Sequence, residues 1–311
     1  SISVGFINND AEFYTSYGHL SRVSDVKVDK NSVFEIASIT KILTANLIAQ
    51  AEIEGKLNIN DFMDDYLPKQ YQLHENLQYK IRISDLASHQ SGLPDIDFRQ
   101  LIASNSQQPV SSVTEASLAQ LINNAKELID YGNYRYSTIG YILLGQILED
   151  IYDKSYASIF EEKMIQPLKL TGTFTNNFKT TNRTTGYNPD GGVQEFFDWN
   201  VTAPAGLIKS NAVDMVTYLK AVLGVTNSFA DASVLSENPF YSKNGIKIGL
   251  GLSIIQDGEN EFFFKTGDLL GQSSIISYDR KNNWGLIILI NQRDSNLIKS
   301  LFSETYEIIK K

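Results

Sequence analysis

Ser38 and Lys41 are the residues of this sequence whose types and spacing best suit covalent chemistry. They lie three positions apart, and the apolar stretch from Ile42 to Glu54 that follows predicts a helix ending near Gly55. On a helix this spacing puts both side chains on one face. A serine hydroxyl attacks a carbonyl group only when a base takes its proton, and a lysine whose pKa is lowered by burial can be that base. The pair therefore predicts an activated serine nucleophile.

The spacing alone does not decide the matter. It recurs at Ser24 and Lys27, in a polar segment typical of a strand or turn, and we interpret that copy as chance. For Ser38 the structural alternative is a serine early in a helix, with a solvated lysine one turn later. Other residues along the chain are needed to decide whether Ser38 is a nucleophile or a structural serine.

Tyr136, Ser137 and Thr138 directly precede a strong helical pattern from Ile139 to Ile151. A tyrosine at a helix entrance can shuttle a proton when a lysine lies beside it. The structural alternative is a core or rim tyrosine, because the chain has 16 tyrosines and most of them must be structural.

Lys265, Thr266 and Gly267 follow the apolar run 262–264. A cation at a strand end, a hydroxyl group beside it and a glycine that permits close backbone approach would together suit a substrate carboxylate. The structural alternative is a turn that ends the strand.

The hydrophobic pattern predicts the elements that position these residues. Residues 2–20 are typical of a hairpin, and four strand patterns cover 246–255, 261–265, 273–278 and 284–291. Helical patterns cover 115–128, 139–151, 156–164, 210–223 and 294–310. We therefore expect an α/β fold of the α+β type, in which N- and C-terminal strands form one antiparallel sheet flanked by helices.

We expect one domain over residues 1–311. Its sheet subdomain would comprise 1–59 and 201–311, and a mostly helical insertion would comprise 60–200. A cleft between the two is the natural place for a ligand. Residues 104–112 and 171–200 are expected to form loops, and the second of these could wall the cleft.

Composition excludes several functions. The net charge of −9 argues against nucleic acid and against an anionic membrane surface as partners. The longest apolar run, 284–290, is too short to span a bilayer. The chain has no cysteine, and its three histidines lack metal-ligand spacing, so we expect no metal and no cofactor. Because the chain starts directly with strand-like sequence and without Met, we expect an exported protein, periplasmic or extracellular, whose signal has been removed.

In this order, the three motifs resemble those of serine β-lactamases and penicillin-binding proteins. The resemblance is strongest to the branch of class C β-lactamases, D-alanyl-D-alanine carboxypeptidases and related esterases. Supporting segments lie at 34–38, 86–94, 141–145 and 204–215. Together they cover about residues 30–290, which is nearly the whole chain.

The resemblance implies a role for each matching residue. Ser38 would form an acyl-enzyme, with Lys41 as its base or as the charge that tunes the base, and Tyr136 would relay a proton to the leaving group. The backbone N–H groups of Ser38 and Asp268 would form the oxyanion hole. Substrate would be bound by Thr138, Lys265, Thr266 and Gly267, with Lys265 and Thr266 gripping its carboxylate.

Thr138 departs from the family, which usually has Asn at this position. Threonine is shorter and lacks the NH₂ donors, so efficient β-lactam turnover is in doubt. A rival alignment uses residues 131–133, Tyr-Gly-Asn, which spell the motif fully. We favour Tyr136, because the helix 141–145 starts at the right offset from it.

Three functions stay open. The first is a serine acyl hydrolase acting on D,D-peptides or β-lactams, with a small-molecule or peptide substrate that bears a carboxylate. The second is a carboxylesterase on small acyl esters, and the third is a catalytically silent penicillin-binding or sensor protein. We expect His89 to make structural hydrogen bonds rather than to act as a base, and residues 249–251, Gly-Leu-Gly, to pack closely. Asp95 and Asp97 could line the cleft, but we favour a solvated loop for them.

Overall fold

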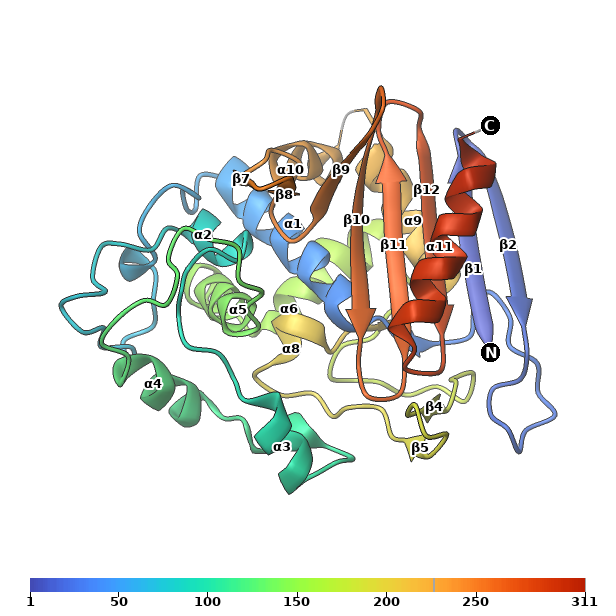
Figure 1. The fold of residues 1–311 in the computed structure, drawn as a ribbon, viewed down its shortest axis with the longest axis horizontal. Coiled ribbons are helices and arrows are strands. Elements are labelled where there is room, and N and C mark those ends of the chain that lie inside the picture. The colour runs from blue at the N-terminus through green and yellow to red at the C-terminus, as the bar shows by residue number, and fades with distance from the viewer. Residues whose placement is uncertain (226, 311) are drawn as a thin grey trace.

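An eight-stranded antiparallel sheet forms one side of the molecule, and strands from both ends of the chain build it (Figure 1). The computed structural model describes residues 1–225 and 227–310. The strand order is β2-β1-β12-β11-β10-β9-β8-β7, so the N-terminal hairpin pairs with the last strand of the chain. The expected fold class is therefore confirmed, while the subdomain boundaries near residues 60 and 200 stay a prediction.

The strands of the large sheet are β1 (Ile2–Asn8), β2 (Ala11–Tyr17), β7 (Tyr241–Lys243), β8 (Ile246–Ile248), β9 (Ser253–Asp257), β10 (Asn260–Asp268), β11 (Ser273–Asp279) and β12 (Trp284–Ile290). Two small sheets pair β3 (Phe34–Glu35) with β6 (Lys209–Ser210), and β4 (Gly186–Tyr187) with β5 (Val193–Gln194).

The α-helices are α1 (Thr40–Ile53), α2 (Ile83–Ala87), α3 (Phe98–Ser104), α4 (Glu115–Asn123), α5 (Ile139–Tyr152), α6 (Tyr156–Phe160), α7 (Gln166–Leu168), α8 (Ala203–Gly206), α9 (Ala212–Leu223), α10 (Ser228–Ser236) and α11 (Ser295–Ile309). Short 3₁₀ turns are η1 (Ala37–Ile39), η2 (Met63–Asp65) and η3 (Pro109–Ser112), and η4 (Glu161–Ile165) is a π-helical turn.

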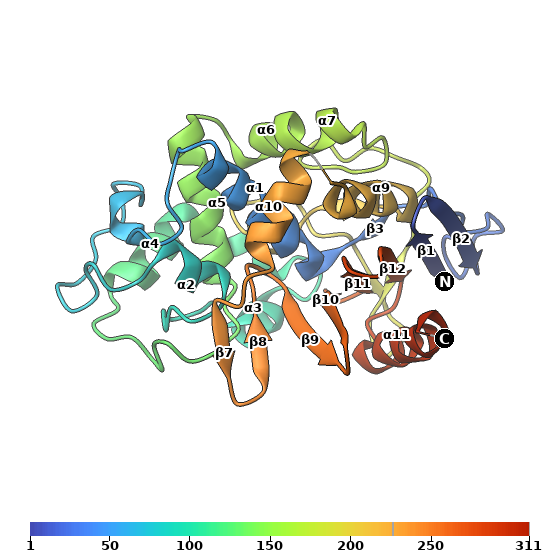
Figure 2. The same cartoon turned by 90° about the horizontal axis from the view of Figure 1, so that it is seen from above.

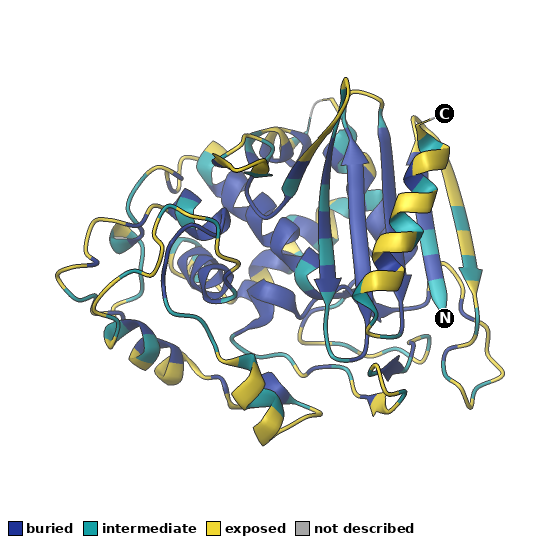
Figure 3. Ribbon diagram, in the orientation of Figure 1, coloured by how far each residue is buried: buried dark blue, intermediate teal, exposed yellow. Residues whose placement is uncertain are grey.

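The sheet separates two apolar layers (Figure 2). On one face lies α11, whose Ile298 and Tyr306 pack in a cluster with Trp284 and Phe262. The opposite face carries the main core, to which α9 and α1 contribute. Because strands β11 and β12 are covered on both sides, every residue in each of them is buried (Figure 3), which explains the continuous apolar run seen in the sequence.

Helix α1 is the central helix of the molecule. Every residue from Thr40 to Ala51 is buried, which is typical of a helix that is surrounded by protein rather than lying on its surface. It packs against α5, α8 and α10. Among residues 1–225 and 227–310, no helix has the length and apolar character needed to cross a membrane.

One predicted strand is divided. Residues 246–255 form two strands, β8 and β9, instead of one. A Cβ on Gly249 would lie 2.1 Å from the Ser236 carbonyl oxygen, and Gly251 has a φ of +78° and would place a Cβ 2.8 Å from Tyr141 Oη. The glycines therefore turn the chain where it packs against α10 and α5.

Helices α3 and α10 were not predicted from the sequence. Each begins at a residue whose side chain accepts hydrogen bonds from the first turn: Asp97 from the N–H groups of Arg99 and Gln100, and Asn227 from those of Phe229 and Ala230. These capping residues were the available signal. Residues 104–112 are correspondingly not all loop, since η3 begins at Pro109.

Gly267 brings β10 against the turn that carries Ser38. A Cβ at this position would lie 2.5 Å from the Ile36 carbonyl oxygen and 3.0 Å from Ala37 Cβ. The turn is also held by Ser274, whose hydroxyl donates to the Ile36 carbonyl over 2.9 Å. No side chain larger than hydrogen therefore fits at position 267 without moving one of the two elements.

We predict that Gly267→Ala destabilises the fold by about 1–3 kcal/mol, because the added methyl group overpacks this contact. The measurement is the free energy of unfolding from denaturant titration. Gly206→Ala is the matched control, since its methyl group would meet only the Ala37 backbone at 3.8 Å, an ordinary contact. Equal stability of the two variants would contradict the close packing described here.

Candidate active site

Ser38 lies on η1, the short turn between β3 and α1. Its neighbour Ala37 has a φ of +50°, a left-handed conformation that costs about 1 kcal/mol or more for a residue with a Cβ. The surrounding contacts with β10 and β11 fix this conformation. The turn leaves Ser38 half-buried, at the floor of a pocket.

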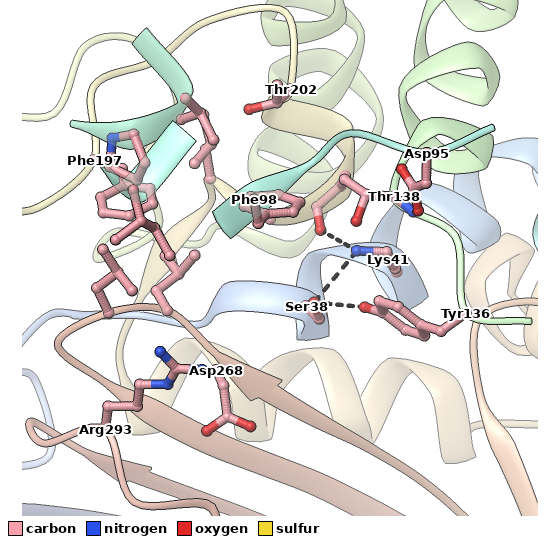
Figure 4. A pocket seen from close by; sticks show the side chains of 18 residues that line it. Ser38, Lys41, Asp95, Phe98, Tyr136, Thr138, Phe197, Thr202, Asp268 and Arg293 are labelled. Carbon is pink, nitrogen blue, oxygen red and sulfur yellow. Dashed lines mark hydrogen bonds between the residues drawn. The ribbon is translucent and has the colours of Figure 1, made fainter. Parts of the chain in front are cut away.

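Lys41 lies one helical turn after Ser38 and is only 1% exposed. Its Nζ donates to Ser38 Oγ over 3.3 Å and to the Ala205 carbonyl of α8 over 2.6 Å (Figure 4). Burial lowers the pKa of Lys41 to about 7, although the charge of Asp95 opposes the shift. A lysine with this pKa is partly neutral near pH 7 and can accept a proton.

Tyr136 comes from the segment before α5 and reaches the same serine. Its hydroxyl donates to Ser38 Oγ over 2.7 Å (Figure 4). Two lysines lie close to its ring, with Lys41 Nζ 5.0 Å and Lys265 Nζ 4.7 Å from the ring centroid. Burial lowers the pKa of Lys265 to about 8. The three sequence motifs therefore meet around one hydroxyl group.

His89 holds the segment that carries Tyr136. Its Nδ1 accepts the Ser137 N–H over 3.1 Å, its carbonyl accepts the Arg135 N–H over 2.8 Å, and its ring lies 4.5 Å from the Tyr136 ring. Burial, followed by the charges of Lys265 and Lys41, keeps the pKa of His89 well below its usual value. The imidazole is therefore neutral and serves as a hydrogen-bond acceptor for the backbone.

Asp95 lines the pocket, which is the less favoured of the two positions expected for it from the sequence. Its carboxylate accepts the N–H groups of Thr138 over 2.7 Å and Ile139 over 3.0 Å, which are donors at the start of α5. Thr138 lines the pocket beside it (Figure 4). The sequence signal for Asp95 was weak, because this contact spans more than forty residues along the chain.

The last four residues of β10, 265–268, lie in different surroundings. Lys265 is buried against Tyr136, Thr266 is half-buried, and Gly267 packs under the Ser38 turn. Asp268, the last residue of the strand, lines the pocket with Ser38. Of these four residues, therefore, only Asp268 borders the pocket directly.

The pocket has a volume of about 320 Å³ and a largely apolar wall. Several of its lining residues were not singled out from the sequence, because they are ordinary apolar residues from distant segments: Phe98, Ile102, Pro109, Val110, Phe197, Leu269 and Leu270. Arg293 also lines it and was not predicted. Over the described parts of the chain, no cluster of three or more His, Cys, Asp or Glu side chains could hold a metal ion.

The competing motifs lie elsewhere. The Tyr131 hydroxyl donates to the Lys80 carbonyl over 2.6 Å and to Asp85 over 2.9 Å, so the structure brings Tyr136 and not Tyr131 to Ser38. Ser24 accepts the Val26 N–H over 3.1 Å within a local turn, and Lys27 is exposed.

The chain is similar to known proteins over most of its length. Protein flp of Staphylococcus aureus strain MRSA252 is 24% identical over 299 residues, which cover 93% of this chain and 59% of that protein. The chain thus spans about three fifths of the length of that relative. Teichoic acid D-alanine hydrolase of Staphylococcus aureus is 30% identical over 166 residues, which cover 53% of this chain and 38% of that protein.

Solved structures share the fold at low identity. A class C β-lactamase from Rhodobacter sphaeroides superimposes with a TM-score of 0.85 at 19% identity, covering 99% of this chain and 94% of that one. A β-lactamase/D-alanine carboxypeptidase from Pseudomonas syringae gives a TM-score of 0.85 at 18% identity, covering 99% and 93%. The family model described as Beta-lactamase matches residues 1–299. Because this match extends over nearly the whole chain, the protein belongs to the β-lactamase family.

Proposed function

We propose that this protein is a serine acyl hydrolase that works through an acyl-enzyme on Ser38. One observation carries the proposal: Ser38 Oγ has Lys41 Nζ at 3.3 Å and Tyr136 Oη at 2.7 Å. A nucleophile with a partly neutral base on one side and a proton carrier on the other has what acyl transfer requires.

In the proposed reaction, neutral Lys41 takes the Ser38 proton as Oγ bonds to the substrate carbonyl carbon. The negative charge that develops on the carbonyl oxygen is stabilised by the N–H groups of Ser38 and Asp268. The bond to the leaving nitrogen or oxygen then breaks, and Tyr136 delivers a proton to that atom. Protonated Lys41 then gives its proton to the Tyr136 oxygen, which restores both groups. Water adds to the carbonyl carbon of the Ser38 ester as Lys41 takes one of its protons. The bond to Ser38 Oγ breaks, and this proton passes to Oγ, which restores the free enzyme.

The proposed substrates are D,D-peptide or β-lactam amides that bear a carboxylate. The resemblance assigns the binding of this carboxylate to Lys265 and Thr266, and Arg293 in the pocket wall offers a further positive charge for it. Two of the similar proteins have D-alanine in their names: teichoic acid D-alanine hydrolase and β-lactamase/D-alanine carboxypeptidase. These names support a substrate that contains D-alanine.

A carboxylesterase is the second candidate. Thr138 replaces the Asn that usually contacts an amide side chain, and the pocket wall is mostly apolar. Both features suit an ester with an apolar acyl group. The intact trio of Ser38, Lys41 and Tyr136 disfavours a catalytically silent protein, which would not need all three.

Mixing the protein with a penicillin should add the mass of the drug to the intact chain, and Ser38→Ala should show no addition. The measurement is intact-protein mass spectrometry over time. A persistent adduct would indicate a penicillin-binding peptidase, and an adduct that vanishes as the drug is consumed would indicate a β-lactamase. If no adduct forms at any time, β-lactams are not substrates, and short acyl esters should then be hydrolysed in a Ser38-dependent manner.

The acylation rate constant should rise about tenfold per pH unit up to about pH 7 and level off above it. The sign follows because burial lowers the pKa of Lys41 to about 7, so only above this pH is the base mostly neutral. Stopped-flow acylation from pH 5 to pH 9 measures it. Lys41→Arg stays charged throughout and should be inactive at every pH. A rate independent of pH would exclude Lys41 as the base.

Tyr136→Phe should slow acyl transfer by ~10²–10⁴-fold, since it removes the hydroxyl group and keeps the ring that lies close to the two lysines. Steady-state kinetics on the best substrate measures the loss. Tyr131→Phe is the matched control and should stay within about twofold of the parent, because that hydroxyl binds Lys80 and Asp85. The reverse order of effects would assign the proton relay to the rival motif.

A further inference from the structure

Glu35 and Lys209 are two buried charged residues that the proposed reaction does not use. They are 1% and 2% exposed. They face each other across the small antiparallel sheet, because Glu35 of β3 is registered with Lys209 of β6. Burying two charges is costly unless each is paired and hydrogen-bonded, so their contacts merit a physical explanation.

Both side chains bind the backbone of one residue, Phe197. The Phe197 N–H donates to Glu35 Oε1 over 2.7 Å, and Lys209 Nζ donates to the Phe197 carbonyl oxygen over 2.7 Å. Hydrogen bonds to charged groups are among the stronger ones in proteins. A single residue is thus held at its donor and at its acceptor by side chains of opposite charge.

Phe197 needs such support because it lies outside regular structure. Its segment runs between β5 and α8, where no sheet ladder or helix satisfies the backbone. The Gln108 side chain binds the backbone on either side of Phe197. Its Nε2 donates to the Phe196 carbonyl over 2.8 Å, and its Oε1 accepts the Asp198 N–H over 2.9 Å. Side chains therefore replace secondary structure over residues 196–198.

Glu35 and Lys209 are close in the chain to the elements that carry the proposed reaction. Glu35 precedes the Ser38 turn by three residues, and Lys209 follows α8, whose Ala205 carbonyl accepts from Lys41. Phe197 itself is 2% exposed and lines the same pocket as Ser38 (Figure 4). Any movement of the pair would therefore move the pocket wall relative to the nucleophile.

The opposite charges of Glu35 and Lys209 favour each other's ionised form. Burial raises the pKa of Glu35 and lowers that of Lys209, and in each case the charge of the other residue opposes the shift. Asp198 adds a second negative charge near Lys209, and the Phe178 ring lies 5.7 Å from its Nζ. Removing either partner would leave the other charge buried with weaker compensation.

We propose that Glu35 and Lys209 are positioning residues that hold Phe197 as the apolar wall of the acyl pocket and thereby select substrates with an apolar acyl chain or aryl group. The proposal rests on the proposed acyl transfer at Ser38. Phe98, Ile102 and Val110 line the same pocket and are apolar as well. Loss of the wall should weaken binding of bulky apolar groups and leave small acyl groups nearly unaffected.

The test compares hydrolysis of p-nitrophenyl acetate, butyrate and octanoate by the parent, Lys209→Met, Glu35→Leu and Glu35→Gln. In Lys209→Met and Glu35→Leu, the octanoate-to-acetate ratio of kcat/KM should fall about tenfold or more, mainly through a higher KM for octanoate. Glu35→Gln keeps an oxygen that can accept the Phe197 N–H, so it should retain most of the parent's ratio.

Lys220→Met is the matched control. Lys220 forms an exposed ion pair with Glu12 over 2.5 Å and lies outside the pocket, so its loss should leave the ratio unchanged. A second readout is acrylamide quenching of tryptophan fluorescence. The chain has two tryptophans: Trp199 follows Phe197 by two residues and is half-buried, while Trp284 is buried in β12. Quenching should increase in Lys209→Met and Glu35→Leu and stay at the parent's level in Glu35→Gln.

The outcomes separate the two proposals. If the parent hydrolyses no ester and forms no penicillin adduct, the proposed function fails, and the quenching pattern alone then supports or overturns the positioning of Phe197. Unchanged ratios and quenching in folded Lys209→Met and Glu35→Leu would overturn the inference. An equal loss on all three esters with a lower melting temperature would also overturn it, because that result indicates a purely structural pair.

Discussion

The burial of the Lys41 amine is the physical constraint on which the site depends. Taking an ammonium group out of water disfavours its charge, and in this protein that effect outweighs the opposing charge of Asp95. Such burial is possible because α1 is enclosed by other elements from Thr40 to Ala51. The Ala205 carbonyl then supplies the one strong acceptor that keeps the amine aimed at Ser38.

The same constraint explains why the site lies where sheet and helices meet. The proposed nucleophile is on a turn that β10 and β11 hold in a left-handed conformation, and the proposed base is on the central helix. The Tyr136 hydroxyl comes from a segment about a hundred residues away. Lys41 and Lys265 both lie close to the Tyr136 ring, and after burial the charge of Lys41 further lowers the pKa of Lys265. A site that buries two lysines in this way can form only when distant parts of the chain pack together.

Features that depend on local spacing could be predicted from the sequence, and features that depend on packing between distant segments could not. The pair Ser38 and Lys41, the strands at both ends and the long helices depend on local spacing, which hydrophobic periodicity records. The pocket wall does not: Phe98 and Phe197 are ordinary aromatic residues whose function depends on contacts with segments far away in the chain. The division of the strand at 246–255 was missed for a related reason. Its glycines are required by close contacts with α5 and α10, which are distant in the sequence, and not by the residues next to them in the chain.

Asp95 shows how finely the opposing charges must be balanced. A free carboxylate this close to the pocket would favour the charged form of Lys41 and so suppress the proposed base. Asp95 instead accepts hydrogen bonds from the backbone N–H groups of Ile96, Thr138 and Ile139, two of them at the positive end of α5. These donors compensate its charge locally, which weakens its field at Lys41. The helix entrance that carries Thr138 therefore contributes to the reactivity of a lysine on another helix, without touching it.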